Sequence, residues 1–219
     1  MKNTEHGAAI YSPFVLSIYD LWVLNISNSF FWKCSTKDIL LPFFKKNLSK
    51  KHLDVGVGTG YYLRNSDLSN HHDITLMDLN ENSLAAARNR LRPFAVKTIH
   101  HDIMQTVPDH FHHLYDSISL FYLIHCLPGD LNNKSLIFKN LKTKLSPHGV
   151  VYGATILGDY IHHNYGGKKL MNIYNKKGIF SNRIDTAEKL KLILEDHFHE
   201  VNIEIYGKVA LFEARQPIL

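Results

Sequence analysis

Cysteine is scarce in this sequence, with Cys34 and Cys126 the two thiols among 219 residues. Two cysteines so far apart give neither a disulfide scaffold nor a C-x-x-C metal site. Disulfides are rare where the cell keeps thiols reduced, so we expect the protein to reside in the cytoplasm.

Long hydrophobic runs are also missing. The most apolar stretch, residues 8–26, is interrupted by Pro13 and Asp20, whereas a membrane-spanning helix needs about 20 predominantly apolar residues. The stretch also lacks the basic segment and small-residue cleavage site of a signal peptide. We therefore expect residues 1–47 to form a helical lid, and we expect no membrane span.

Tracts of like charge are absent too. Lys and Arg exceed Asp and Glu by 25 to 20, but the lysines are scattered in pairs such as Lys45-Lys46. Scattered pairs are typical of solvated surface, so we expect no nucleic-acid partner. Histidine doublets recur at 71-72, 100-101, 112-113 and 162-163. Adjacent strand residues face opposite sides of a sheet, so these doublets predict no metal site.

What the sequence does contain is a turn with glycine at every second position. Residues 52–55 read as a buried strand that leads into this turn. Glycine there permits positive φ and a close approach of the backbone to a ligand. The glycines are Gly56, Gly58 and Gly60. A dinucleotide fingerprint would need a glycine where Tyr61 stands; the pattern is instead D-x-G-x-G-x-G, beginning at Asp54.

A second acid stands where a ribose-binding carboxylate is expected. Asp78 ends the apolar run 74–77 and lies 22 residues beyond Gly56. In nucleotide-binding sheets, an acid about 20 residues after the glycine turn accepts hydrogen bonds from the ribose. The pair of features indicates an adenosine-containing cofactor.

Strand-like and helix-like segments alternate from Leu53 onward, as in a parallel sheet covered by helices. The predicted strands are residues 52–55, 74–78, 96–102, 117–121 and 150–155. The predicted helices are residues 82–88, 131–145 and 188–197. Two further strands, 201–205 and 209–214, are joined by a turn at Gly207-Lys208 that is short enough to require antiparallel pairing.

These motifs resemble those of class I S-adenosylmethionine-dependent methyltransferases, and the chain is similar to bacterial small-molecule methyltransferases of that class. The matching segments are residues 54–60, 77–80, 101–103, 115–121 and 145–150. The resemblance implies an α/β, Rossmann-like methyltransferase fold: a mostly parallel seven-stranded sheet with a C-terminal antiparallel hairpin and helices on both faces. The methyltransferase domain would span residues 48–219, with a cap insertion at 157–182.

The resemblance also implies the cofactor, S-adenosyl-L-methionine, and the residues that hold it. The glycine turn would bind its carboxylate, Asp78 both ribose hydroxyls and Asp102 the adenine amine, with apolar neighbours against the ring. The predicted cofactor residues are Asp54, Gly56, Gly58, Gly60, Asp78, Leu79, Asp102, Ile103 and Phe121.

Methyl transfer from a sulfonium is an in-line displacement that an enzyme can promote largely by orienting the acceptor. Where the acceptor is a hydroxyl or a protonated amine, a general base helps. His125, after the fourth strand, is the first candidate, and His162 and His163, after the fifth, come second. With fifteen histidines in the chain, some will fall near a cleft by chance.

Aromatic residues crowd the two segments that close over the substrate in this family. The predicted lid residues are Tyr11, Tyr19, Trp22 and Tyr160. A lid of this composition would accept a small aromatic or hydrophobic molecule, methylated on O or N, less readily on C. The alternative is that these rings pack the helices onto the sheet. We expect a monomer or homodimer.

Two other functions remain open. An RNA or protein methyltransferase is one, although residues 121–124 lack the [DN]-P-P-[YF] stretch that grips a planar nitrogen in many such enzymes. A regulatory protein that binds S-adenosylmethionine without catalysis is the other. The intact glycine turn and both acids argue against a decayed site.

Overall fold

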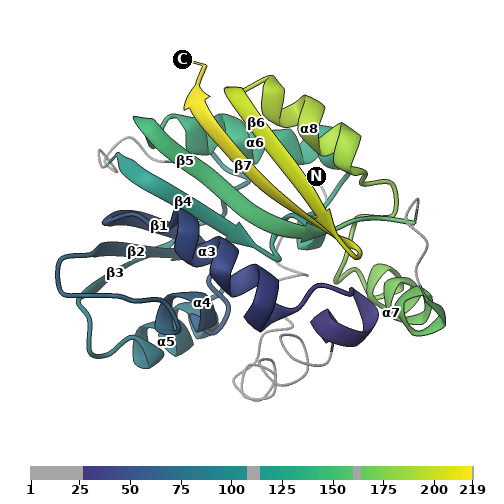
Figure 1. The fold of residues 1–219 in the computed structure, drawn as a ribbon, viewed down its shortest axis with the longest axis horizontal. Helices are drawn as coiled ribbons and strands as arrows, with labels where there is room; N and C mark the ends of the chain where they lie inside the picture. The colour runs from purple at the N-terminus through teal and green to yellow at the C-terminus, as the bar shows by residue number, and fades with distance from the viewer. Residues whose placement is uncertain (1–26, 108–113, 160–163, 219) are drawn as a thin grey trace.

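The computed structural model describes residues 27–107, 114–159 and 164–218 (Figure 1). Within these residues seven strands form one sheet in the order β3-β2-β1-β4-β5-β7-β6. The strands are β1 (Lys51–Val55), β2 (Asp73–Asp78), β3 (Val96–His100), β4 (Tyr115–Phe121), β5 (Leu145–Ile156), β6 (Phe198–Tyr206) and β7 (Val209–Pro217). Neighbours among β1–β5 pair in parallel, whereas β7 runs antiparallel to both β5 and β6. The predicted fold class is confirmed.

The start of β5 differs from the prediction. The strand begins at Leu145, before the predicted start at residue 150, and includes residues 146–149, whose Ser-Pro-His-Gly sequence is typical of a turn. Its pairing with β4 jumps from Tyr115↔Leu145 to Ser117↔Val150. Two residues of β4 therefore oppose a longer segment of β5, and the extra residues leave the ladder as a bulge. The turn residues are thus accommodated inside the strand.

The longer helices begin after side chains that cap them. α5 (Glu81–Arg90) follows Asn80, whose Oδ1 accepts hydrogen bonds from the amides of Asn82 and Ser83. Caps of the same kind precede α6 (Leu131–Lys142) at Asp130, α7 (Tyr165–Lys176) at Asn164 and α8 (Ala187–Glu195) at Thr186. A cap satisfies amides that have no partner within the helix, so these side chains fix where each helix begins.

Helices cover both faces of the sheet (Figure 1). α6 and α8 lie on one face, where Phe138 belongs to a core cluster that includes Leu53 of β1. α3 (Leu41–Asn47) and α5 lie on the other, where Phe44 belongs to a second cluster with Leu76 of β2. Four of the five residues of β1 are buried because the strand is covered on both sides, as is usual for a parallel sheet.

The described part of the predicted N-terminal lid packs on the sheet. A π-helical segment at Thr36–Leu40 leads into α3, and the ring of Phe44 lies 5.7 Å from those of His52 and Tyr152. Several predicted site residues lie outside the described residues, namely Tyr11, Tyr19, Trp22, Tyr160, His162 and His163. In the part of the chain that is described, no helix has the length and apolar character of a membrane span.

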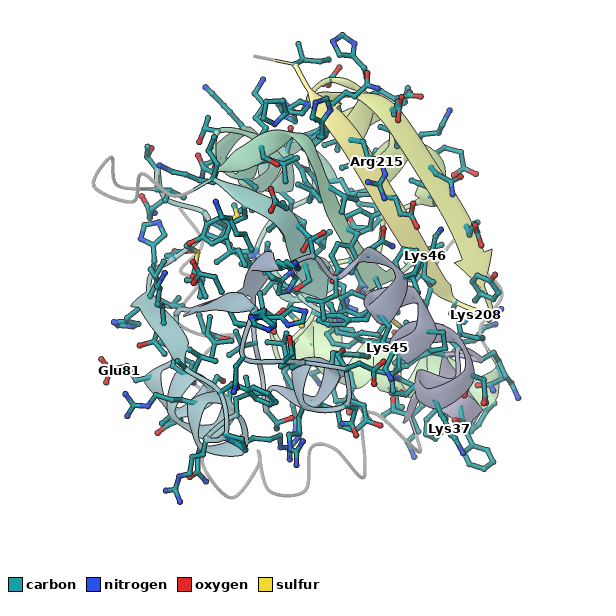
Figure 2. All side chains as sticks on the ribbon, turned by 60° about the vertical axis from the view of Figure 1, so that its left-hand side comes forward. Lys37, Lys45, Lys46, Glu81, Lys208 and Arg215 are labelled. Carbon is teal, nitrogen blue, oxygen red and sulfur yellow. The ribbon has the colours of Figure 1, made fainter. Side chains whose placement is uncertain are left out.

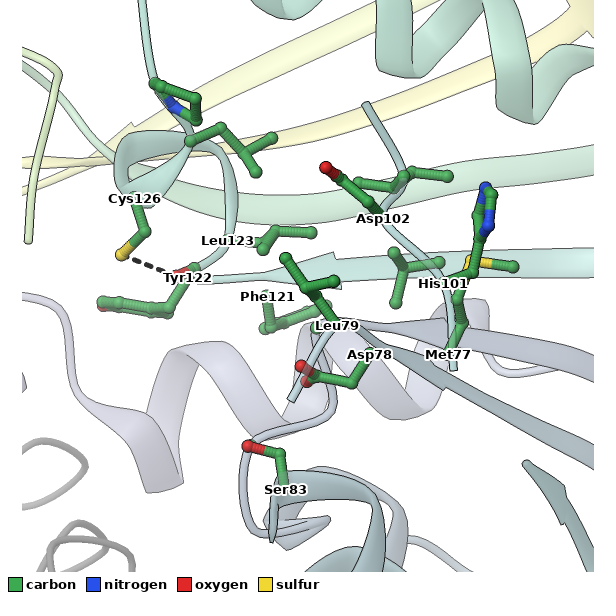
Figure 3. A pocket seen from close by; sticks show the side chains of 16 residues that line it. Met77, Asp78, Leu79, Ser83, His101, Asp102, Phe121, Tyr122, Leu123 and Cys126 are labelled. Carbon is green, nitrogen blue, oxygen red and sulfur yellow. Dashed lines mark hydrogen bonds between the residues drawn. The ribbon is translucent and has the colours of Figure 1, made fainter. Parts of the chain in front are cut away.

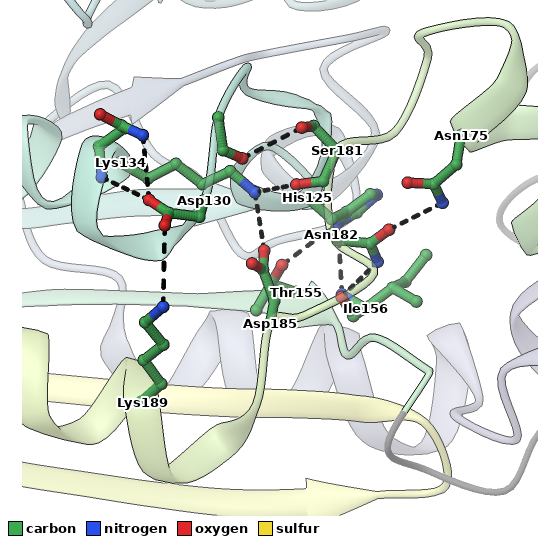
Figure 4. Close-up of polar contacts among 12 residues, drawn as sticks. His125, Asp130, Lys134, Thr155, Ile156, Asn175, Ser181, Asn182, Asp185 and Lys189 are labelled. Atoms are coloured by element: carbon green, nitrogen blue, oxygen red, sulfur yellow. Dashed lines mark hydrogen bonds and ion pairs between the residues drawn. The ribbon is translucent and has the colours of Figure 1, made fainter.

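A buried ion pair fastens the segment after α7 to the rest of the fold (Figure 4). Nζ of Lys134 on α6 lies 2.7 Å from Oδ2 of Asp185 and donates to the carbonyl of Ser181 at 2.7 Å. Burial lowers the pKa of Lys134 and raises that of Asp185, while the opposite charge of each partner acts against the shift. Nearby, Asn182 Nδ2 donates to the carbonyl of Ile156 at 2.9 Å. These bonds hold the segment against α6 and the end of β5.

We expect Lys134→Met to lower the free energy of unfolding by about 3–5 kcal/mol, because Asp185 would remain buried without its cation. The control is Lys191→Met on α8, where the cation forms a half-exposed i,i+4 pair with Glu195. Its loss should stay below about 1 kcal/mol. Urea unfolding at neutral pH measures both variants, and equal losses would show that the buried pair has no special weight.

Candidate functional site

A cavity opens at the carboxyl ends of the parallel strands (Figure 3). The ends of β1, β2 and β4 and the loop after β3 contribute to its wall. Ligands of open parallel sheets bind outside the carboxyl ends, where the strand order reverses; here the reversal falls between β1 and β4. The predicted cofactor residues on this wall are Gly56, Gly58, Asp78, Leu79, Asp102, Ile103 and Phe121.

The glycine turn is shaped by close contacts. All three of its glycines have positive φ, at 73° for Gly56, 51° for Gly58 and 70° for Gly60. A Cβ on Gly56 would lie 2.9 Å from Cδ1 of Leu123, and one on Gly60 would lie 3.1 Å from Cα of Ala87 on α5. A Cβ on Gly58 would meet nothing within 4 Å, because this glycine faces the cavity. Close contacts therefore fix the turn at Gly56 and Gly60, whereas at Gly58 the turn is open to a ligand.

The helix after this turn is short. α4 covers Tyr61–Arg64, a single turn whose N-cap residue is Gly60. The dipole of a helix sums over its aligned peptide units, so one turn contributes little. Any attraction for a carboxylate at this place would therefore come mainly from the amides of the turn itself.

Asp78 connects the glycine turn with the start of α5. Its Oδ1 accepts a hydrogen bond from the amide of Asn80 at 2.8 Å, and the amides of Val57 and Gly58 also bond to its carboxylate. Burial, partly offset by these hydrogen bonds, raises the pKa of Asp78 to about 6. Figure 3 shows the carboxylate on the same side of the cavity as Ser83. This acid stands where it can accept from ligand hydroxyls.

The loop after β3 supplies the next part of the wall. Asp102 Oδ1 accepts a hydrogen bond from the amide of Met104 at 2.9 Å, a local turn that fixes the carboxylate. Ile103 lines the cavity here, and Leu79 and Phe121 line it from β2 and β4. One acid with three apolar neighbours is a suitable environment for a flat, polar-edged ring.

Asp54 and Gly60 lie beside the cavity and are not part of its wall. Asp54 is 6% exposed, and the hydroxyl of Ser119 donates to its Oδ1 at 2.5 Å. Burial raises the pKa of Asp54 to about 7; the bond from Ser119 acts against this rise, and the charge of Asp78 adds to it. Gly60 owes its place to the close packing of Ala87. Both residues therefore affect the shape of the cavity without lining it.

His125 is buried in the structure. It is 2% exposed, and its Nδ1 accepts a hydrogen bond from the amide of Ile156 at 3.3 Å. Its ring lies 4.5 Å from that of Phe180 and 5.5 Å from that of Tyr122. Burial lowers the pKa of His125 to about 3. A neutral, enclosed imidazole of this kind packs the end of β5 and is a poor proton acceptor, which weighs against the predicted role as general base.

The structure adds residues to the cavity that were not predicted. They are Val55, Met77, Ser83, His101, Tyr122, Leu123, Cys126, Leu127 and Pro128. Tyr122 has φ of 59°, the left-handed conformation that residues other than glycine rarely adopt. Its position directly after β4 was a usable signal, because loops beyond the carboxyl ends of strands line such sites. The sequence signal for Ser83 was weaker: this residue lies in the first turn of a helix that starts beside Asp78.

Among the described residues, no group of three or more His, Cys, Asp or Glu side chains is arranged to hold a metal ion. Cys34 and Cys126 are not joined by a disulfide bond, and the thiol of Cys126 donates a hydrogen bond to the carbonyl of Tyr122 at 3.7 Å. Burial raises the pKa of Cys34 to about 12, so that thiol is a packing group. The wall of the cavity carries the carboxylates of Asp78 and Asp102, a few other polar side chains such as Ser83 and His101, and mainly apolar side chains.

We expect Gly56→Ala to lower the free energy of unfolding more than Gly178→Ala. Both glycines have positive φ, which costs an alanine about 1–2 kcal/mol. A Cβ on Gly178 would meet nothing within 4 Å, whereas one on Gly56 must displace Leu123, at about 1–3 kcal/mol more. Urea unfolding of the two variants measures the difference. Equal losses would show that Leu123 moves aside freely.

Comparison with known proteins agrees with this geometry. A family model described as a methyltransferase domain matches residues 32–197. The physcion biosynthesis cluster O-methyltransferase of Aspergillus chevalieri is 40% identical over 219 residues, covering 100% of this chain and 99% of the relative. The YbcY protein of Escherichia coli (strain K12) is 47% identical over 192 residues, covering 87% and 98%.

The fold has relatives among solved structures as well. The N-methyltransferase NodS from Bradyrhizobium japonicum WM9, in complex with S-adenosyl-L-homocysteine, superposes with a TM-score of 0.59 at 15% identity, over 82% of this chain and 85% of NodS. That likeness is one of fold, while the family match covers most of the sequence. The chain thus belongs to the class I S-adenosylmethionine-dependent methyltransferases, the family that its motifs resemble.

Proposed function

We propose that the protein methylates an oxygen atom of a small aromatic or hydrophobic molecule. The observation that carries this proposal is the cavity at the β1/β4 reversal, with two carboxylates at one end and apolar side chains at the other. The choice of oxygen is supported by the relative from Aspergillus chevalieri, which is named an O-methyltransferase.

The residues of the cavity fit S-adenosylmethionine, which would supply an activated methyl group on its sulfonium. Asp78 would accept from the ribose hydroxyls, and Asp102 from the adenine amine. Leu79, Ile103 and Phe121 would pack against the adenine. The open face of Gly58 leaves room for the methionine part, because a Cβ there meets nothing within 4 Å. These assignments are the ones that the resemblance to the methyltransferases implies, and the presence of all five side chains on the wall supports them.

The acceptor side of the cavity is apolar. Tyr122, Leu123, Leu127 and Pro128 line it together with the thiol of Cys126. In Figure 3, Tyr122 and Cys126 lie across the cavity from His101 and Asp102. Apolar walls bind a flat or hydrophobic molecule and exclude water. The segments predicted as lid and cap, residues 1–47 and 157–182, contribute none of their described residues to this wall, and we keep their role in covering the acceptor as a proposal.

The acceptor need not lose its proton to His125. Holding a hydroxyl in line with the methyl group already brings a large part of the rate, because oriented reactants reach effective molarities of about 10⁵ M or more. Bound S-adenosylmethionine would supply the methyl group, and its carbon–sulfur bond would break as the acceptor oxygen bonds to the methyl carbon. The hydroxyl proton would pass to solvent at the mouth of the cavity. His125 contributes by packing the loop that carries Tyr122 and Cys126.

An RNA or protein acceptor is less well supported. The lysines of α3 lie on one side of the molecule with Arg215 (Figure 2), but they are engaged locally. Lys45 pairs with Asp67 at 3.2 Å and Lys46 with Glu213 at 2.8 Å. A nucleic-acid substrate would be revealed by binding that weakens log-linearly with salt, with a slope of several units.

The proposed function is tested by incubating the protein with S-adenosylmethionine and matched pairs of phenols and anilines, and measuring S-adenosylhomocysteine. Product with phenols and none with the matched anilines is the expected result. Transfer to anilines alone would overturn the choice of oxygen. Cofactor binding without transfer to any member of the panel would favour the regulatory alternative.

We expect Asp78→Ala to weaken binding of S-adenosylhomocysteine more than tenfold, because hydrogen bonds to a charged group contribute about 1.5–3 kcal/mol each. Asp67→Ala is the control, since that side chain is 91% exposed and contacts Lys45. A ligand at 100 times its dissociation constant should add about 2.7 kcal/mol of stability to the wild type and the control. If the ligand raises the melting temperature of Asp78→Ala as much as that of the wild type, Asp78 does not contribute to cofactor binding.

We expect His125→Gln to leave the shape of the pH–rate profile unchanged between about pH 6 and about pH 9, although it lowers stability. The reason is that burial holds the pKa of His125 near 3, so the ring does not titrate in that range. If the variant loses a rate limb that the wild type shows near neutrality, His125 is the base after all.

A further inference from the structure

The central strand pair of the sheet carries a buried row of polar side chains. The parallel register of β1 and β4 places His52 opposite Ser117 and Asp54 opposite Ser119. His52, Ser117 and Ser119 are each 0% exposed, and Asp54 is 6% exposed. Buried polar groups are costly unless they are hydrogen-bonded, so such a row needs a complete set of partners.

The partners form one continuous chain. The amide of Ser49 donates to Ser117 Oγ at 2.9 Å, and Ser117 Oγ lies 2.8 Å from His52 Nδ1. On the other side of the ring, His52 Nε2 lies 3.1 Å from Ser119 Oγ. The hydroxyl of Ser119 then donates to Asp54 Oδ1 at 2.5 Å. The chain begins at a backbone amide and ends at a carboxylate beneath the glycine turn.

The carboxylate end determines the direction of the bonds along the chain. An amide can only donate and an ionised carboxylate can only accept. Ser119 donates its single hydroxyl proton to Asp54. The Ser119 oxygen must therefore accept from His52, so Nε2 of the ring carries the imidazole proton. Burial lowers the pKa of His52 to about 3, so the ring is neutral, and Nδ1 accepts from Ser117.

The other titratable groups around Asp54 do not stabilise its ionised form. Asp78, from β2, raises the pKa of Asp54 by repulsion. Tyr152, from β5, has a pKa raised by burial and by the charge of Asp54. His72, before β2, lowers the pKa of His52. Among the described residues, the hydrogen bond from Ser119 is the interaction that lowers the pKa of Asp54.

We propose that His52 is a positioning residue of the methyl-donor site, which through Ser119 favours the ionised form of Asp54 beneath the glycine turn. The negative charge favours the ammonium group at the methionine end of the cofactor, so the inference rests on the methyltransferase function. A proton on Asp54 reverses the chain: Asp54 donates to Ser119, Ser119 donates to Nε2, and the ring carries its proton on Nδ1. The tautomer of His52 thus reports the charge of Asp54.

The tautomer can be read from the ¹⁵N chemical shifts of the imidazole, with His52→Gln used to assign the signals. We expect the Nε2–H form at about pH 8 and a growing Nδ1–H form as pH falls through about 7, the pKa of Asp54. In Ser119→Ala the link to Asp54 is cut, and the tautomer should no longer follow pH. One tautomer across the whole range in the wild type would overturn the proposal.

Calorimetric titration with S-adenosylhomocysteine across pH tests the effect on binding. The affinity of the wild type for S-adenosylhomocysteine should decrease as the pH is lowered, because Asp54 then takes up its proton. Ser119→Ala removes the bond that lowers this pKa, so the fall should begin at higher pH, with about tenfold weaker binding at pH 7. Ser119→Thr keeps the hydroxyl and should restore the wild-type curve. Ser117→Ala spares the bond to Asp54 and should change the curve less.

The outcomes separate this proposal from the function on which it rests. A wild type that binds no S-adenosylhomocysteine would contradict the methyltransferase function itself. A wild type that binds, with Ser119→Ala following the same affinity curve at every pH, would overturn the role of His52 alone.

Discussion

The parallel pairing of β1 with β4 is the interaction on which the rest of the structure depends. The strand order reverses at this pair, which separates the loops at the carboxyl ends and opens the cavity. The same pair brings Leu123, after β4, against Gly56, after β1. It also sets Asp54 opposite Ser119. A slip of one residue would turn every side chain to the other face, so fold and site share one register.

Much of this arrangement could be predicted because its signals are local. Period-two alternation and a two-residue turn were sufficient to predict the antiparallel hairpin at Gly207-Lys208. Asp78 could be assigned because it stands directly at a strand end, at a fixed distance from the glycine turn. Glycine itself reports a backbone conformation that other residues avoid, so the turn could be recognised without knowing what packs against it.

The remainder depends on contacts between distant segments, and these leave no local signal. Lys134 has the appearance of an ordinary surface lysine, yet it is fully buried against Asp185, 51 residues away. His125 follows β4 as a catalytic residue could, and its burial depends on Phe180 and the end of β5. The place of Asp54 behind the turn follows from Ser119 on another strand. Such residues take their roles from the assembled sheet.

The reversed strand β7 has a consequence for how the chain folds during synthesis. β7 lies between β5 and β6, but residues 209–217 leave the ribosome after every other strand. Until then β5 presents an unpaired edge, which is a hazard for association with other chains. The strands whose ends line the cavity are all synthesised earlier, so a nascent chain can form the cavity while the sheet is still open.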